Sequence, residues 1–213
     1  MARGGRVRSP RSLARRTTPC FSGDVMLIVC EGAKTEPSYF EGLKDAWKLQ
    51  PLQVEIVGRE CGSAPISVVD HAIALRDERR RDSKRARGRP EFDEVWCVFD
   101  RDRHVSLSQA LDKARGNDIK VALSAPCFEL WYLLHFTYTS RAFRSFDALS
   151  KVLRKYLPDY TKSETPLSVL LPRLDTAKGN AVKLREHNRD TGSSCPCADV
   201  GRLVIALEQI KGH

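Results

Sequence analysis

Short apolar runs alternate with amphipathic segments over the first 125 residues of the chain. The runs rich in β-branched and aromatic residues are typical of buried strands and lie at 25–30, 52–58, 93–104 and 119–124, the third running into acids at its end. The segments between them repeat apolar residues at helical spacing and lie at 35–49, 64–88 and 106–118. This alternation predicts an α/β fold, with a mostly parallel four-stranded sheet and helices on both of its faces.

The pattern changes after residue 125, where helical segments follow one another without strands. The segment 127–136 is apolar almost all round, which predicts a buried helix that packs on the sheet and places His135 in the core. Three further helices are expected at 143–157, 165–187 and 197–211, the second interrupted near Pro172. We therefore expect a disordered basic arm at 1–20, an α/β core at 21–125 and an α-helical part at 126–213 packed on that core.

Positive charge is concentrated in two segments. The formal net charge is +9, yet residues 1–16 hold six arginines and no acid, and residues 76–90 hold eight Lys or Arg against three acids. Basic segments beside a slightly acidic body suit a polyanionic partner, because cations neutralise phosphates and release counterions. A solvated tail and a solvated helix end are the alternative. The candidate phosphate-binding residues of the second segment are Arg79, Arg80, Arg81, Lys84, Arg85 and Arg87.

Hydropathy and cysteine usage predict a soluble, cytoplasmic protein. No apolar run approaches the ~20 residues of a membrane span. The Arg-rich start lacks the apolar stretch of a secretory signal, although its Arg and Ser content leaves an organelle transit peptide open. The seven cysteines are odd in number and form no C-x-x-C pair, which favours a reducing compartment. Cys195 and Cys197 could hold a metal, but no partner pair has zinc-finger spacing.

Acidic residues stand where two of the predicted strands end. Glu31 follows the first strand, and Asp100 and Asp102 end the third. In open α/β sheets, ligands bind beyond the carboxyl ends of parallel strands. If these two strands are neighbours, the three carboxylates meet at one rim, where a hard divalent cation such as Mg²⁺ or Mn²⁺ would relieve their repulsion. Taken singly, each acid is also compatible with a polar turn.

This arrangement resembles the Toprim domain of topoisomerases, bacterial primases and OLD-type nucleases, in which one strand ends in Glu and a later strand ends in Asp-x-Asp. The stretches "LIVCEGAKTEPSYFEGL", "VFDRDRH", "PCFELWYLLHF" and "NAVKLREH" narrow the resemblance to the RloB-like family, over roughly 24–212. That resemblance implies a Toprim-like core, a role in bacterial antiviral defence by abortive infection, and an OLD-like ATPase partner. It makes Glu31 a general acid/base or metal ligand, and Asp100 and Asp102 the main metal ligands.

Further candidates surround this acidic set. Glu36 resembles a second acid of the OLD-type motif, although its spacing from Glu31 is five residues instead of four; alternatively, it stabilises the start of a helix for which Thr35 is the expected N-cap. Glu129 stands in an apolar helix, where an ionised carboxylate is costly unless paired or metal-bound. Candidate phosphate contacts near the acids are Lys34 and His104, and by the resemblance Lys162 stabilises a leaving group.

Two classes of function follow from these residues. The first is a Mg²⁺- or Mn²⁺-dependent phosphodiesterase, most simply a nuclease that cleaves DNA or RNA. The second is a non-catalytic subunit that binds nucleic acid or acts as a sensor in the same defence complex. A haloacid-dehalogenase-like phosphatase fits less well, because its DxDx[TV] nucleophile follows the first strand, whereas DRDRH follows the third here.

Overall fold

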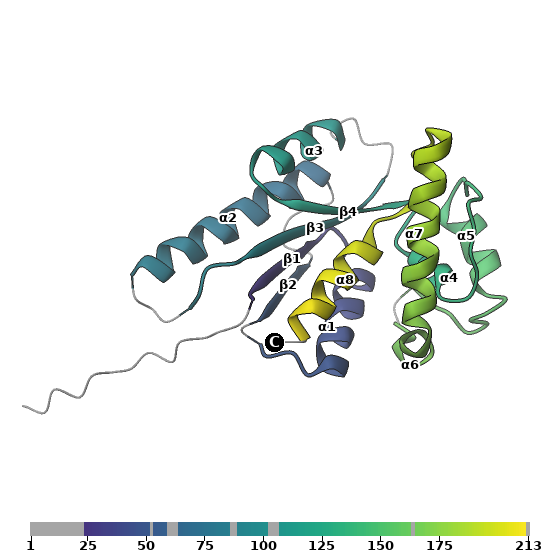
Figure 1. Cartoon of the computed structure of the whole chain (residues 1–213), viewed down its shortest axis with the longest axis horizontal. Helices are drawn as coiled ribbons and strands as arrows, with labels where there is room; N and C mark the ends of the chain where they lie inside the picture. The colour runs from purple at the N-terminus through teal and green to yellow at the C-terminus, as the bar shows by residue number, and fades with distance from the viewer. Residues whose placement is uncertain are drawn as a thin grey trace, which may run out of the picture.

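The structure is a computed structural model that describes residues 24–51, 53–58, 64–85, 89–101, 107–162 and 165–211 (Figure 1). Several predicted features lie outside these residues. They are the basic arm at 1–20 and the candidate site residues Arg87, Asp102 and His104.

A five-stranded sheet forms the centre of the fold. Its strands lie in the order β2-β1-β3-β4-β5, and the first four are parallel, as predicted. They are β1 (Met26–Cys30), β2 (Val54–Gly58), β3 (Glu94–Asp100) and β4 (Lys120–Ala125). The two-residue β5 (Cys197–Ala198) pairs antiparallel with β4. The prediction missed β5 because these two residues carry no strand pattern and were assigned to the start of the last helix.

Helices cover both faces of the sheet (Figure 1). Successive side chains of β1 alternate between two apolar clusters, as the pleat of a strand requires. The cluster around Leu27 and Val29 is completed by α2 (Pro65–Lys84) and α3 (Leu107–Gly116). The cluster around Met26, Ile28 and Cys30 is completed by α1 (Thr35–Trp47), α4 (Glu129–Leu134) and α8 (Val200–Lys211). The predicted α/β architecture is therefore confirmed.

The helical part after residue 125 joins this second cluster. It adds α5 (Phe146–Leu153), α6 (Leu167–Leu170), a 3₁₀ turn (Leu171–Arg173) and α7 (Leu174–Thr191). The predicted interruption near Pro172 is confirmed by the 3₁₀ turn, since proline has no N–H to continue the helical ladder. All six residues of α4 are buried, and His135 directly after it is buried as predicted. Within the described residues, no helix has the length and apolar character needed to cross a membrane.

The pairing of β1 with β3 decides where the acids lie. The two strands are parallel neighbours with Cys30 opposite Val98, so Glu31 and Asp100 reach the same rim of the sheet. The chain leaves β2 at this rim, enters α2 and returns along it before β3 begins. A helix of 20 residues is about 30 Å long, so the basic end of α2 lies toward the opposite rim.

Candidate functional site

Glu31 and Asp100 are fixed by hydrogen bonds between the ends of β1 and β3. The Glu31 backbone N–H donates to the Val98 carbonyl oxygen at 2.9 Å, which extends the strand pairing by one residue. In return, the Asp100 backbone N–H donates to Oε2 of Glu31 at 3.1 Å. The two predicted strand-end acids are therefore held beside each other by the backbone of the sheet.

These acids open onto a pocket of about 480 Å³, which we call the acidic pocket. Four predicted carboxylates line it from four different elements, together with both predicted lysines. Its lining residues are Glu31, Gly32, Ala33, Lys34, Thr35, Glu36, Asp100, Phe128, Glu129 and Lys162.

Glu36 is a buried acid in the first turn of α1 that faces the other carboxylates. Its pKa is raised, mainly by burial and further by the charges of Glu129 and Glu31. A hydrogen bond to its own backbone amide and the charge of Lys162 act in the opposite direction. Glu36 therefore contacts the start of α1 through its own backbone amide and also lines the acidic pocket, while its predicted role as a metal ligand stays a prediction.

The loop before α1 differs from its prediction at Thr35. The N-cap residue is Lys34, which makes no capping hydrogen bond with its side chain. Instead of capping the helix, the Thr35 hydroxyl donates to the backbone carbonyl of Lys162 at 3.1 Å. This bond attaches the segment that carries Lys162 to α1, and it is a long-range contact that no local pattern could indicate.

Glu129 is 1% exposed and begins α4. The Tyr160 hydroxyl donates to its Oε1 at 3.1 Å, which satisfies part of the buried carboxylate. Burial and the charge of Glu129 raise the pKa of Tyr160, so its hydroxyl remains a donor at neutral pH. Tyr160 was not among the predicted site residues, and its one signal in the sequence is its position two residues before Lys162.

The donors around the acidic pocket suit a hard divalent cation, because all four are carboxylates. Two of them project from strand ends, and Tyr160 orients a third. Among the residues that the structure describes, no three His, Cys, Asp or Glu side chains form a group that could hold a metal ion. The described acids supply oxygen donors but no complete metal-ligand group, and Asp102, one of the two predicted main metal ligands, lies outside the described residues.

The profile of a protein family described as "RloB-like protein" matches residues 26–207, which is most of the chain. The chain belongs to the RloB-like family. The match includes the strands and helices that build the acidic pocket. Searches of curated proteins and of solved structures found no match.

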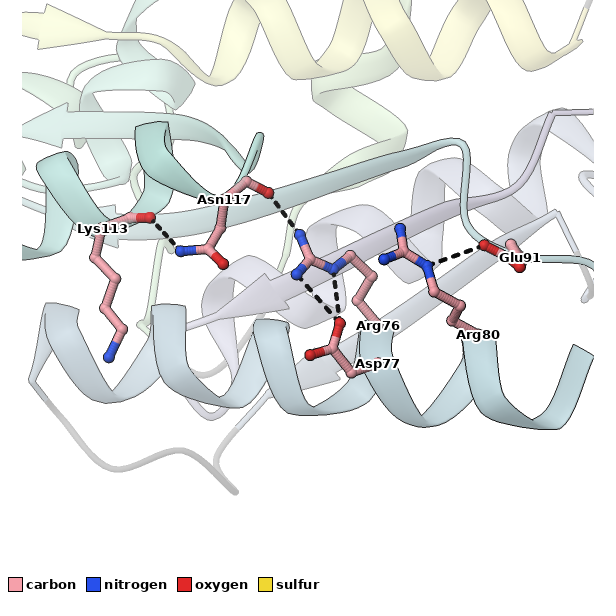
Figure 2. A network of polar contacts seen from close by, with 6 residues as sticks. All are labelled: Arg76, Asp77, Arg80, Glu91, Lys113 and Asn117. Carbon is pink, nitrogen blue, oxygen red and sulfur yellow. Dashed lines mark hydrogen bonds and ion pairs between the residues drawn. The ribbon is translucent and has the colours of Figure 1, made fainter. Parts of the chain in front are cut away.

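Several of the basic residues along α2 of this RloB-like chain bond to neighbouring elements of the fold. Arg79 is buried: its Nε donates to the Pro90 carbonyl at 2.8 Å, and its Nη1 pairs with Glu55 at 3.2 Å. Arg80 pairs with Glu91 at 3.2 Å, and Arg76 donates to the Asn117 carbonyl (Figure 2). Much of the predicted phosphate-binding segment thus holds α2 against its neighbours.

The remaining candidates on α2 are exposed but distant from the acids. Arg81 and Lys84 lie in the last turn of the helix, and Arg85 directly follows it. All three lie toward the rim opposite the acidic pocket. The structure therefore separates the Arg-rich segment from the strand-end acids, and the cations beside the acids are Lys34 and Lys162.

The Cys-Pro-Cys segment makes structural contacts in the described part of the chain. Cys197 belongs to β5, its thiol contacts the Leu123 carbonyl oxygen at 3.7 Å, and burial raises its pKa to about 12. Cys195 is exposed, and neither thiol forms a disulfide. The metal-binding role that the sequence left open for this pair stays a hypothesis.

Proposed function

We propose that this RloB-like protein is a metal-dependent phosphodiesterase that cleaves nucleic acid. The observation that supports this most strongly is the meeting of four carboxylates at the carboxyl rim of a parallel sheet, with two lysines beside them. Such a rim is the usual ligand site of an open α/β fold. Clustered carboxylates are suited to a divalent cation, and the adjacent ammonium groups are suited to phosphate.

Each residue of the acidic pocket has a role in this proposal. Glu31, Asp100 and Asp102 would hold a Mg²⁺ or Mn²⁺ ion, which when bound supplies charge stabilisation to phosphate oxygens and a more acidic water. The hydrogen bond from the Asp100 amide fixes the Glu31 carboxylate before any substrate arrives. Tyr160 orients Glu129 in the same way. Lys34 and Lys162 bring positive charge to the phosphate and to the leaving oxygen.

The test is cleavage of end-labelled DNA and RNA oligonucleotides, single-stranded and duplex, with Mg²⁺, Mn²⁺ or EDTA. We expect cleavage with either metal and none with EDTA. Asp100→Asn and Glu31→Gln should each slow cleavage by about two orders of magnitude or more, since metal charge stabilisation supplies several kcal/mol. Glu41→Gln is the matched control, because Glu41 is a half-exposed acid on α1 that pairs with Lys44 and does not line the pocket.

The resemblance to defence proteins adds a partner to this proposal. We propose that cleavage occurs in an antiviral defence complex with an OLD-like ATPase, so each reaction is run with and without that ATPase and ATP. The variant pattern described above should hold in both settings, because the acids lie on this chain.

The alternative is a non-catalytic subunit that binds nucleic acid. It is favoured by the lack of a group of three metal-ligating side chains among the described residues. It predicts that the wild-type protein binds oligonucleotides without cleaving them under any metal or partner condition. Cleavage that disappears in Asp100→Asn would exclude it.

A further inference from the structure

A second, larger hollow adjoins the acidic pocket. It measures about 1030 Å³ and shares two lining residues, Asp100 and Lys162, with that pocket. We call it the basic-aromatic groove. Its lining residues are Asp100, Arg101, Ala125, Pro126, Cys127, Ala142, Phe143, Arg144, Ser145, Phe146, Lys162, Cys195 and Pro196.

The charge of the groove is opposite to that of the acidic pocket. Asp100, at the junction, is the one acid among its lining residues, whereas Arg101, Arg144 and Lys162 supply three cations. Arg144 is exposed and forms no ion pair or hydrogen bond with the residues that the structure describes. Arg101 donates to the Ser194 carbonyl at 2.7 Å, which holds its guanidinium at the groove. A phosphate backbone leaving the acids would therefore meet positive charge next.

Two partly exposed aromatic rings line the groove together with these cations. Phe143 and Phe146 pack one side against the core of the protein and keep surface at the groove. The Arg141 guanidinium lies 5.4 Å from the centre of the Phe143 ring, and the Lys162 ammonium 4.9 Å from that of Phe146. Aromatic rings interleaved with cations are what proteins use to bind single-stranded nucleic acid, with bases stacked on the rings and phosphates on the charges.

On the basis of the proposed phosphodiesterase function, we propose that the basic-aromatic groove binds the unpaired nucleotides next to the scissile phosphate. The substrate class is therefore single-stranded DNA or RNA, or an unpaired segment of a folded RNA. A duplex buries its bases inside a convex cylinder, so they cannot reach Phe143 and Phe146 in a concave groove of this size. An unpaired strand presents bases and phosphates together.

The test measures binding without cleavage. Fluorescence anisotropy is recorded in EDTA with short single-stranded DNA, single-stranded RNA and the corresponding duplex. We expect tighter binding of the single strands, weakened roughly fivefold or more by Phe143→Ala. Arg144→Gln should lower the slope of log affinity against log salt by about 0.7. The control variants are Tyr138→Ala, an exposed aromatic residue that does not line the groove, and Arg81→Gln on α2.

A second readout uses the wild-type protein and so does not depend on how the variants fold. Cys195 is exposed and lines the groove, so a bound strand should slow its alkylation, measured by peptide mass spectrometry. Three results would each overturn the proposal. The first is that a saturating single strand leaves Cys195 unprotected from alkylation, and the second is that duplex binds as tightly as single strand. The third is that Arg81→Gln weakens binding while the groove variants do not. If the groove variants weaken single-strand binding as expected but no Asp100-dependent cleavage is found, the proposed phosphodiesterase activity is overturned and the groove proposal stands. If the groove variants cleave and bind single strands like the wild type, the groove proposal is overturned and the proposed phosphodiesterase activity stands.

Discussion

At the scale of single residues, the acidic pocket depends on a close fit between Gly32 and Glu36. The Glu36 carboxylate lies directly against the Gly32 backbone, so a Cβ at Gly32 would stand 1.9 Å from Oε2 of Glu36. The Gly32 backbone is also close to Gly58, because a Cβ added at Gly58 would stand 2.9 Å from the Gly32 carbonyl oxygen. The glycine after the first strand-end acid is therefore explained by the space that the second acid occupies.

Substitution of Gly32 by alanine tests this fit. Gly32→Ala should displace the flexible end of the Glu36 side chain, reduce cleavage, and lower the free energy of unfolding toward the lower end of about 1–3 kcal/mol. Gly179→Ala is the matched control: nothing lies within 4 Å of the added Cβ in α7, so the variant should gain up to about 1 kcal/mol from helix propensity. Urea unfolding measures the stability of both variants, and cleavage rates measure their activity. A Gly32→Ala protein as stable and active as the wild type would contradict the fit.

His135 makes the stability of the fold dependent on pH. It is buried after α4, its Nδ1–H donates to the Trp131 carbonyl at 2.9 Å, and burial lowers its pKa to about 4. The His135 side chain takes up a proton near pH 6.5 in the unfolded chain and only near pH 4 in the folded chain. The contribution of His135 to stability therefore falls as the pH drops from about 6.5 to about 4. Between pH 7 and pH 5 the loss should be about 2 kcal/mol.

Urea unfolding at these two pH values tests the assignment to His135. The wild type should lose about 2 kcal/mol more than His135→Gln, which retains a donor for the Trp131 carbonyl but does not titrate. Equal pH dependence of the two proteins would assign the effect to other groups.

At the scale of secondary-structure elements, α2 shows how helical spacing divides a uniformly basic sequence. Their charge alone marks residues 76–90 as a basic segment suited to a polyanionic partner, but one-dimensional charge does not show which side chains turn inward. In the helix, Arg76, Arg79 and Arg80 are spaced three and four residues apart and reach neighbouring elements, although Arg80 keeps an exposed side chain; Figure 2 shows the contacts of Arg76 and Arg80. Arg81 and Lys84 are exposed. The same Arg-rich run thus contains structural cations and solvent-facing ones.

Arg79 should therefore be a stability residue. Its guanidinium joins α2 to Glu55 of β2 and to the segment before β3, and it lies 4.5 Å from the centre of the Phe92 ring. Arg79→Gln should lower the free energy of unfolding by about 1–3 kcal/mol, because the Pro90 carbonyl loses a charged donor. Arg81→Gln, two residues later and exposed, should change it by less than about 0.5 kcal/mol. Denaturant unfolding of both variants measures these changes. Similar losses of unfolding free energy in Arg79→Gln and Arg81→Gln would contradict the division into structural and solvent-facing cations.

At the scale of the whole molecule, opposite rims of the sheet carry different charges. Four carboxylates gather at the carboxyl rim, and the exposed cations of α2 lie toward the other rim. The sequence predicted the sheet and its strand-end acids because strand patterns and strand ends are local properties. It did not predict β5, Tyr160 or the basic-aromatic groove, because each depends on residues far apart in the chain that meet only in the folded protein. Their signals are too short or too dispersed for a single sequence to show.

The most direct test of the acidic pocket is the single-turnover cleavage rate of a labelled single strand in Mn²⁺, compared between the wild type and Asp100→Asn. The amide keeps the size of the side chain and removes only its charge, so circular dichroism and thermal melting should match the wild type. We expect the rate to fall by about two orders of magnitude or more. A folded Asp100→Asn protein that cleaves at the wild-type rate would contradict the assignment of this rim as the catalytic site.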